Sequence, residues 1–517
     1  MSAVAGVLGV AVSLAHGLSD SQARAPNLDT SHVAAAAGPS VHYVNSRGSD
    51  SAGDGSRSRP WRSLAKACAA TPGGDGRTIR VSAGTYSESA TCDLACSTNL
   101  RGAGRAKTLV TGSADPLIRL RNCMQPGNKQ TISGFRLDGQ GRTAGVFGLR
   151  ALRTRGLTIS GMVAEGFKGP RNAGGGAMDI RWAWDLDLGN SILRNSGRST
   201  SQACSGTLGV GEIHDSAIHD LEITEDEGYG IKASMSPGSE SSNLSNVNFF
   251  NLRVRALTDT CARWNTLAVE LWQTDAVATT IRNSSFNRSV SLTDFGNAPP
   301  LLHRYRYRLH HNIFLMGSRD DYAIELDQNS SIVDHNYISS GLYPIANFAS
   351  QRKRGLTIHH NVFDNQTGPT AGVHMTAGVL NAKFYNNTVV LRRPTFREGI
   401  FSLSEFGFSG STIEIKNNLF TNPHYSIGDK LGTGLDLATI DHNGFHNVTA
   451  KGTASVVGNP LLPLHGGFPR AYVPAAGSPA IDAGLKIPGI TTGFTGVAPD
   501  LGAFDHGTAP WFVGPKR

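Results

Sequence analysis

At 517 residues the chain exceeds the size at which one globular core stops growing, which leaves several domains or one repetitive fold. Glycine accounts for 61 residues and charged residues for only 17%, without a long amphipathic helical pattern, which is typical of an all-β solenoid with many tight turns. The net charge of +8 predicts an anionic partner. An acidic polysaccharide fits better than nucleic acid, because no basic helix, zinc-ligand spacing or RNA-binding motif accompanies the charge.

The first 40 residues contain an apolar run, Ala3 to Leu14, followed by small residues, which predicts a segment for export. No other run is long and apolar enough to cross a membrane. From the export segment we expect a secreted or periplasmic protein, and we expect it to be a monomer. An oxidising compartment could pair the even number of cysteines, but their spacing leaves the pairing open. They are Cys68, Cys92, Cys96, Cys123, Cys204 and Cys261.

Residues 41–90 predict an N-terminal cap and first coil, with a short strand near Tyr43, a helix started by Pro60 and a strand over 78–86. This opening resembles the cap of secreted right-handed parallel β-helix proteins of the pectate-lyase type. The resemblance implies an all-β parallel β-helix, which we expect over residues 91–457. Residues 458–517 resemble the C-terminal closing segment of such proteins, and we expect them to cover the last coil.

Short segments of alternating apolar and polar residues recur through the predicted β-helix, as expected for strands with one buried face. Stacking these segments places one outward residue of each coil in a line, the outward column. Its predicted members are Arg119, Arg150, Arg181, Gly211, Lys232, Glu270, Ser291, Glu325, Asn347, His374 and Ser402.

A second series carries an asparagine in each coil, at steps of 24, 25, 26, 31 and 25 residues from Asn312 to Asn443. Asparagine tolerates a left-handed turn and can hydrogen-bond to its copy in the next coil. The series therefore predicts a stacked asparagine ladder, and we interpret the histidines beside it as turn residues.

The outward column is polarised, with arginines before Lys232 and glutamates after it. Guanidinium groups suit carboxylates or sulfates on successive sugars, so we expect Arg119, Arg150 and Arg181 to bind substrate. Tyr229, Asn347 and His374 are further candidates for substrate contact, and Arg181, His374 or Tyr229 could also donate a proton.

The run Glu225, Glu227 and Lys232 resembles the active-site motif of the calcium-dependent polysaccharide lyases that include alginate lyases and chondroitinase B. The resemblance implies β-elimination on a uronate-containing polysaccharide. Glu225 and Glu227 would bind Ca²⁺ with a preceding asparagine, either Asn190 or Asn195. Lys232 would be the base, and Arg253 would assist as the acid.

Three alternatives remain open at the level of sequence. Glu270 and Glu325 lie two coils apart in the predicted column, near the spacing used by inverting glycoside hydrolases, with Asp294 and Asp327 as further candidates. A C5-epimerase would begin with the same proton abstraction as a lyase. A glycan-binding solenoid without catalysis would bind the polysaccharide and leave it intact.

Overall fold

The computed structural model describes residues 40–74, 76–142, 146–169, 174–198, 204–233, 242–257, 267–271, 274–293, 300–301, 304–317, 322–339, 341–364, 366, 368–392, 398–403, 410–425 and 431–516. The predicted export segment, Cys261 and Asp294 lie outside these residues. No helix among the described residues is long and apolar enough to span a membrane.

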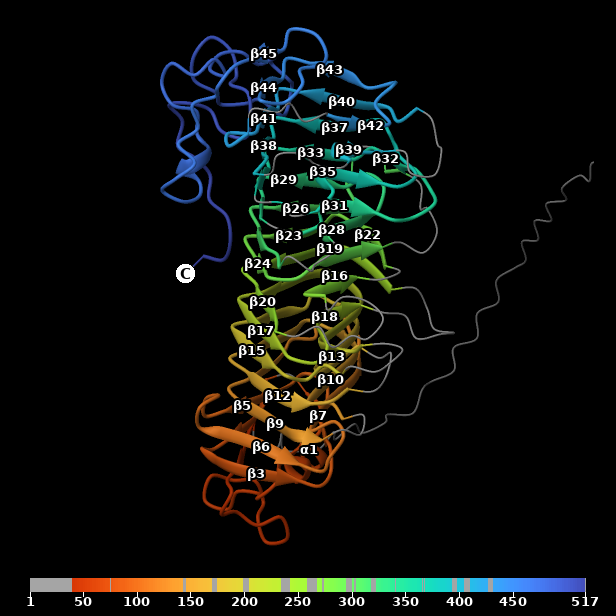
Figure 1. Cartoon of the computed structure of the whole chain (residues 1–517). Helices are drawn as coiled ribbons and strands as arrows, with labels where there is room; N and C mark the ends of the chain where they lie inside the picture. The colour runs from red at the N-terminus through yellow and green to blue at the C-terminus, as the bar shows by residue number, and fades with distance from the viewer. Residues whose placement is uncertain are drawn as a thin grey trace, which may run out of the picture. The chain divides into compact units, whose positions relative to one another are not determined.

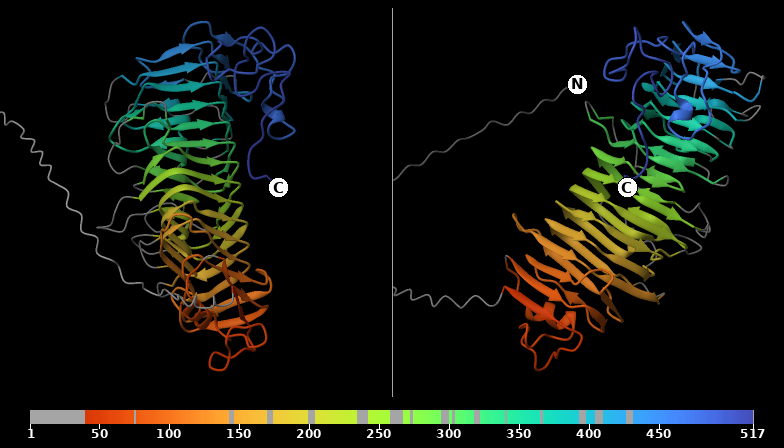
Figure 2. Two further views of the ribbon diagram at one scale, coloured as in Figure 1. Left: turned by 180° about the vertical axis from the view of Figure 1, so that it is seen from behind. Right: turned by 90° about the vertical axis from the view of Figure 1, so that its left-hand side faces the viewer.

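The chain from Ser40 onward forms one compact unit, a parallel β-helix in which each strand pairs in parallel with its counterparts in neighbouring coils (Figures 1 and 2). The predicted fold class is therefore confirmed. The strands form three rows, and row 1 and row 2 join into one sheet through the long strand β16.

Row 1 carries the predicted outward column. It comprises β4 (Cys92–Asp93), β7 (Ile118–Cys123), β10 (Leu149–Arg155), β13 (Gly175–Trp184), β16 (Gly206–His219), β18 (Tyr229–Ala233), β21 (Val269–Leu271), β25 (Val290–Thr293), β28 (Tyr322–Asp327), β31 (Tyr343–Asn347), β35 (Thr370–Met375), β39 (Gly399–Ser402) and β42 (Gly432–Thr433).

Row 2 begins with the first strand of the chain. It comprises β1 (Val41–Val44), β2 (Arg77–Val81), β5 (Thr98–Gly102), β8 (Gln130–Ser133), β11 (Leu157–Ser160), β14 (Asp187–Gly189), the second half of β16, β19 (Ser242–Phe250) with β22 (Thr274–Val277) beside its start, β23 (Thr279–Arg282), β26 (Tyr307–His310), β29 (Ile332–Asp334), β33 (Thr357–His359), β37 (Ala382–Tyr385), β40 (Ile413–Lys416) and β43 (Thr439–Asp441).

Row 3 is a separate sheet. It comprises β3 (Gly84–Glu88), β6 (Thr108–Gly112), β9 (Arg136–Arg142), β12 (Val163–Phe167), β15 (Ser191–Arg194), β17 (Leu221–Glu225), β20 (Arg253–Ala256), β24 (Ser285–Phe286), β27 (Ile313–Leu315), β30 (Tyr337–Ser339), β34 (Val362–Asp364), β38 (Thr388–Val390), β41 (Leu419–Thr421), β44 (Gly444–His446) and β45 (Val456–Val457). A small pair, β32 (Lys353–Arg354) and β36 (Val379–Leu380), lies apart from the rows.

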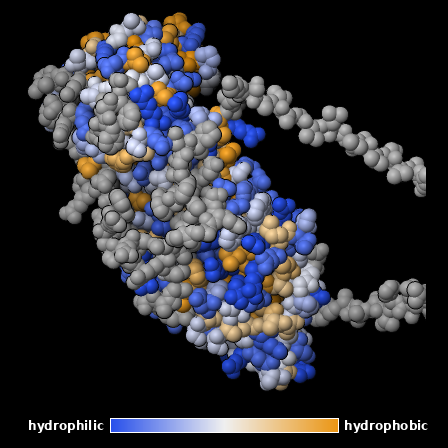
Figure 3. Space-filling view, turned by 90° about the vertical axis from the view of Figure 1, so that its right-hand side faces the viewer, coloured by the Kyte–Doolittle hydropathy of each residue, from blue (hydrophilic) through white to orange (hydrophobic). Residues whose placement is uncertain are grey.

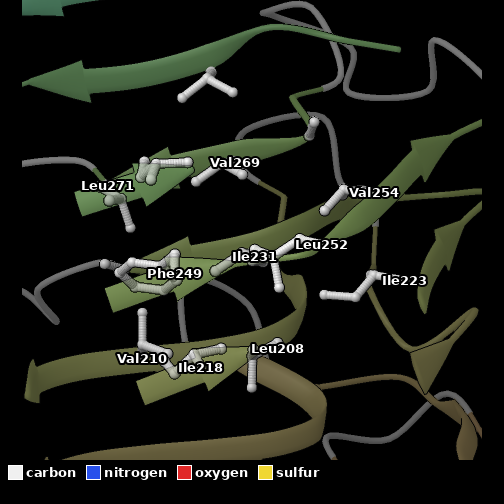
Figure 4. Close-up of a cluster of buried hydrophobic side chains, with 14 of the residues drawn as sticks. Leu208, Val210, Ile218, Ile223, Ile231, Phe249, Leu252, Val254, Val269 and Leu271 are labelled. Atoms are coloured by element: carbon white, nitrogen blue, oxygen red, sulfur yellow. The ribbon is translucent and has the colours of Figure 1, made fainter. Parts of the chain in front are cut away.

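The core fills the interior of the β-helix because successive strands turn apolar side chains inward. Ile231, for example, is fully buried and pairs with Leu208 before it and Val269 after it, so like side chains stack from coil to coil (Figure 4). On the face seen in Figure 3, hydrophobic residues are scattered among hydrophilic ones. The buried residues on either side of Lys232, Ile231 and Ala233, fix its position in the strand.

The predicted asparagine ladder is confirmed between row 2 and row 3. The backbone N–H of each ladder asparagine donates to the side-chain oxygen of the next at 2.9–3.0 Å, from Asn312 to Asn443, and all six residues are fully buried. The left-handed backbone belongs to the preceding residue, such as His335 with φ 54° or His360 with φ 52°, and not to the ladder asparagine as expected. The histidines thus occupy turn positions.

The N-terminal coil is closed by helix α1 (Leu64–Ala70). Ser63 caps the helix by accepting from the Lys66 N–H, and the Glu88 carboxylate accepts from the N–H groups of Leu64 and Ala65 at 2.8 and 3.1 Å. Two disulfides, Cys68–Cys92 and Cys96–Cys123, fasten this end, and Cys204 is disulfide-bonded as well.

The C-terminal segment runs back along the flank of the β-helix (Figure 1). It therefore contacts more of the β-helix than the last coil, which was the only coil that it was expected to cover. Its turn η1 (Arg470–Tyr472) packs in an apolar cluster with Val362 and Phe504. Hydrogen bonds join the segment to coils far apart, from the Ala503 N–H to Thr388 Oγ1 at 2.9 Å and from the Gly514 N–H to the His311 carbonyl at 2.9 Å. The segment therefore contacts several coils of row 3.

Candidate functional site

The outward column of row 1 follows from the strand register. Its members are Asp93, Arg119, Arg150, Asp179, Gly209, Lys232, Glu270, Ser291, Glu325, Ala346, His374, Ser402 and Thr433. Three predicted members are wrong. Asp179 and Gly209 replace Arg181 and Gly211, which lie two residues further along, and Ala346 replaces Asn347.

The arginines of the column are paired with carboxylates of the chain. Arg119 contacts Asp93 through two nitrogens at 2.5 and 2.6 Å, and hydrogen bonds from this guanidinium lower the pKa of Asp93. The fully buried Asp179 accepts from Arg150 Nε and Arg181 Nε, each at 3.0 Å. A substrate carboxylate would have to compete with these ion pairs, which weakens the prediction of an anion-binding arginine row.

Lys232 lies at the centre of the column and is only 6% exposed. Its Nζ donates to the Cys204 carbonyl at 2.7 Å, lies 2.9 Å from Glu270 Oε2 and sits 5.0 Å from the centroid of the Tyr229 ring. Burial raises the pKa of Tyr229, and the Glu270 carboxylate adds to the rise. Lys232 is therefore ion-paired with Glu270, and Tyr229 remains a neutral phenol.

Glu325 lies two coils beyond Glu270, with Ser291 between them. Ser291 Oγ donates to Glu325 Oε2 at 2.5 Å, and the Tyr322 hydroxyl also hydrogen-bonds this carboxyl. Burial raises the pKa of Glu325, against the lowering effect of those bonds, and the carboxylates of Asp327 and Glu270 raise it further. The two glutamates therefore have opposite environments, one beside an ammonium group and one buried among hydroxyls.

The Glu225 carboxylate is fully buried and accepts hydrogen bonds from four backbone N–H groups at 2.7–3.0 Å and from the Thr207 hydroxyl. The four N–H groups belong to Ser196, Gly197, Asp226 and Glu227. A Cβ on Gly197 would lie 3.0 Å from this carboxylate, so only glycine leaves room for the contact. Glu225 thus holds two turns together.

Glu227 is half-exposed and its carboxylate lies 3.1 Å from Lys168 Nζ. Because the oxygens of Glu225 are already used by the chain, Glu225 and Glu227 do not fit the calcium site implied by the lyase motif. The two candidate asparagines, Asn190 and Asn195, both adopt positive φ, at 46° and 45°, at the turns that bound β15.

Arg253 does not share the face of Lys232. It lies on β20 of row 3, where it pairs with Glu222 and Ser285, and its side chain is exposed. Together with Arg105 and Asn190 it lines a hollow of about 210 Å³ on that face. The predicted role of Arg253 as the acid partner of Lys232 is therefore not supported by its position.

His374 belongs to the column but is only 1% exposed, because aromatic rings pack against it. The Tyr343 ring lies 4.3 Å and the Phe348 ring 5.5 Å from the imidazole, and His374 Nδ1 lies 3.2 Å from Glu398 Oε2. Asn347 is buried and donates to Asp327 Oδ1 at 2.8 Å, so it is a structural residue at the end of β31.

One group of possible metal ligands occurs among the described residues. Ligand atoms of Asp334, His335 and His359 lie within 4.8 Å of one another. Arg308 donates to both oxygens of Asp334 at 2.8 Å, however, and His335 Nδ1 contacts the same carboxylate at 2.8 Å. The carboxylate is already neutralised, so we interpret this group as a structural ion-pair network on row 2.

Several residues of the site were not predicted as functional. Tyr322 and Phe348 lie at strand ends, where alternation gives no direction for a side chain, and their sequence context carries no motif. Asp179 was visible as a polar residue two positions before Arg181. Alternation could not choose between them, since a shift of two residues keeps the same face of the strand.

A family described as "Protein of unknown function (DUF1565)" matches residues 46–168, about a quarter of the chain. No curated protein matches the sequence. Among solved structures, the pectate lyase Pel9A is 12% identical over 90% of this chain and 96% of its own, with a TM-score of 0.33. The catalytic domain of a GH87 α-1,3-glucanase in complex with tetrasaccharides is 10% identical over 73% of this chain and 64% of its own, with a TM-score of 0.40.

A third solved structure, the mannuronan C-5 epimerase AlgE6 A-module of Azotobacter vinelandii, is 12% identical over 76% of this chain and 92% of its own, with a TM-score of 0.29. The similar structures are mostly carbohydrate-processing proteins. At these scores the likeness assigns no activity or residue role to the chain.

Proposed function

We propose that the protein hydrolyses a glycosidic bond of a polysaccharide at Glu270 and Glu325. The observation that carries the proposal is the pair of carboxyl groups in one column with opposite environments. Glu270 faces the ammonium of Lys232 at 2.9 Å, whereas burial raises the pKa of Glu325. Two carboxyl groups in such different surroundings are typical of an acid–base pair.

The spacing supports inversion. Two coil steps place the backbones of the two glutamates about 9.6 Å apart, near the upper end of the separation that leaves room for a water between inverting carboxyl groups. Glu325 would donate its proton to the leaving oxygen, and Glu270 would take a proton from the water that attacks the anomeric carbon. Lys232 would hold Glu270 in position, and Tyr322 and Ser291 would orient Glu325.

β-Elimination with Lys232 as the base is the second candidate. Its support is the central position and deep burial of Lys232 beside the neutral Tyr229. Against it stand the ion pair with Glu270, which occupies the amine, and the engagement of Glu225 by backbone amides. Hydrolysis requires neither a free lysine nor calcium.

The test is a panel of neutral and acidic polysaccharides assayed both for new reducing ends and for the ultraviolet absorbance of unsaturated uronates. Hydrolysis predicts reducing ends without that absorbance, and loss of activity in both Glu270→Gln and Glu325→Gln. Glu222→Gln, an exposed glutamate on row 3, is the matched control and should keep full activity. Unsaturated products that require Lys232 would select the second candidate, and binding without cleavage across the panel would contradict both.

A further inference from the structure

Four aromatic rings gather at row 1, from the coil that carries Glu325 to the second coil beyond it. The Phe348 ring lies 5.9 Å from Tyr322, 5.8 Å from Tyr343 and 5.5 Å from His374, so it contacts three rings at once. The Tyr343 and His374 rings also pack against each other at 4.3 Å. We name these four residues the aromatic platform.

Phe348 is 41% exposed, whereas His374 is buried and the two tyrosines are partly buried. A single exposed apolar side chain needs no explanation. A phenylalanine that packs against three other rings is restricted in orientation, however, and it offers an apolar surface beside polar groups. Such a surface loses little conformational entropy when a flat ligand stacks on it.

The platform is joined to the proposed acid. Tyr322 hydrogen-bonds Glu325 and its ring also contacts Phe348, so one side chain belongs to both groups. Strand register places Ala346, two residues before Phe348, directly beside Glu325, which corresponds to one coil step of about 4.8 Å. A chain lying along the column could therefore place one sugar at Glu325 and a neighbouring sugar on Phe348.

The charged groups next to the platform are already paired or neutral. Lys353 is ion-paired with Asp327, His374 contacts Glu398, and Glu325, as the proposed acid, carries a proton. Among these groups a sugar carboxylate would meet no unpaired cation, so it would lose hydration in a partly buried site without gaining a partner. The C–H face of an uncharged sugar would stack on Phe348 without this cost.

We infer that the aromatic platform is a binding subsite for an uncharged pyranose ring, so that the polysaccharide bound by this protein carries neutral sugars beside the cleaved bond. The inference rests on the proposed function for the position of that bond. It revises the expectation of an acidic polysaccharide, which came from the net charge of the whole chain.

The experiment measures binding separately from cleavage. Glu325→Gln protein, which is expected to be inactive, is tested by affinity electrophoresis and calorimetry against neutral glucans, xylans and mannans and against polyuronates. In this background Phe348→Ala should weaken binding of the neutral polysaccharide about 2- to 15-fold, the range for one aromatic contact. Phe348→Tyr should retain binding, and Phe512→Ala, another exposed phenylalanine, should leave it unchanged.

Binding restricted to polyuronates, or binding of neutral polysaccharides unaffected by Phe348→Ala, would overturn the inference, and so would the lack of any glycan binding. Thermal unfolding of each variant shows whether a loss of binding reflects loss of the fold. Neutral glycan binding that depends on Phe348 without cleavage by the unmodified protein would support the subsite and refute the hydrolase. The two proposals therefore fail in distinguishable ways.

Discussion

Glu225 and Glu227 give a matched test of the calcium motif, because they lie two residues apart and differ in environment. Glu225→Gln replaces one carboxylate oxygen by an NH2 group. One oxygen of Glu225 accepts from the N–H groups of Asp226 and Glu227, and the other accepts two N–H groups and the Thr207 hydroxyl. Whichever oxygen is replaced, at least two donors lose their acceptor and face another donor.

Each orphaned buried donor costs about 1–3 kcal/mol, so the substitution should destabilise the protein by about 2–6 kcal/mol. Glu227→Gln removes a half-exposed ion pair with Lys168 and should cost about 1 kcal/mol or less. Thermal unfolding followed by circular dichroism compares the two variants. We expect that adding Ca²⁺ leaves the thermal-unfolding midpoint unchanged in the unmodified protein and in both variants.

The reasoning would be refuted if Glu225→Gln unfolded at the same temperature as Glu227→Gln. It would also be refuted if Ca²⁺ stabilised the unmodified protein and this effect were lost in both variants. The second result would restore the lyase motif as a metal site. The first would mean that the amides around Glu225 find other acceptors.

Three further predictions concern the ladder, acid stability and activity. Asn361→Ala removes the oxygen that accepts from the backbone N–H and the side-chain amide of the buried Asn336. In denaturant unfolding it should destabilise the fold by about 3–5 kcal/mol. The control Asn248→Ala, on the half-exposed face of β19, should cost about 0.5 kcal/mol or less. Burial lowers the pKa of three histidines at the ends of row 2 strands to about 4. These are His310, His311 and His359. As the pH falls, the unfolded chain binds protons before the folded chain does, so stability should decrease between about pH 6.5 and 4. A flat midpoint of thermal unfolding across this range would contradict the assignment. If Glu325 is the acid, the protein is active at pH values below the raised pKa of Glu325 and loses activity as the pH rises through that pKa. A rate that stays constant up to alkaline pH would argue for another proton donor.

The repeats made the fold predictable. The Asn312 to Asn443 series has one function in every coil, and its spacing gave both the coil length and the hydrogen-bonded ladder. The outward column was predictable wherever a strand has one polar residue between apolar ones, as at Lys232, Glu270 and Glu325. These positions depend on local alternation, which the sequence displays directly.

The errors have identifiable physical causes. Arg181 and Asp179 lie on the same face of β13, so alternation cannot say which one aligns with Arg150, and only pairing between coils fixes that register. The polar side chain of Asn347 predicts it as the outward member of its strand, but Ala346 holds that position while Asn347 bonds to Asp327. The motif predicts a calcium ligand at Glu225 because it specifies residue types and not the backbone amides that already occupy this carboxylate.

The C-terminal segment changes how the β-helix should respond to force or heat. In a solenoid each coil contacts only its neighbours, so unfolding can start at an end and proceed coil by coil. Here Tyr472 reaches Tyr337, 135 residues earlier, and Gly514 reaches His311, so one segment ties distant coils together. Unfolding from the C-terminal end must first detach this segment from the coils that it contacts. The segment therefore makes those coils unfold together as one cooperative unit.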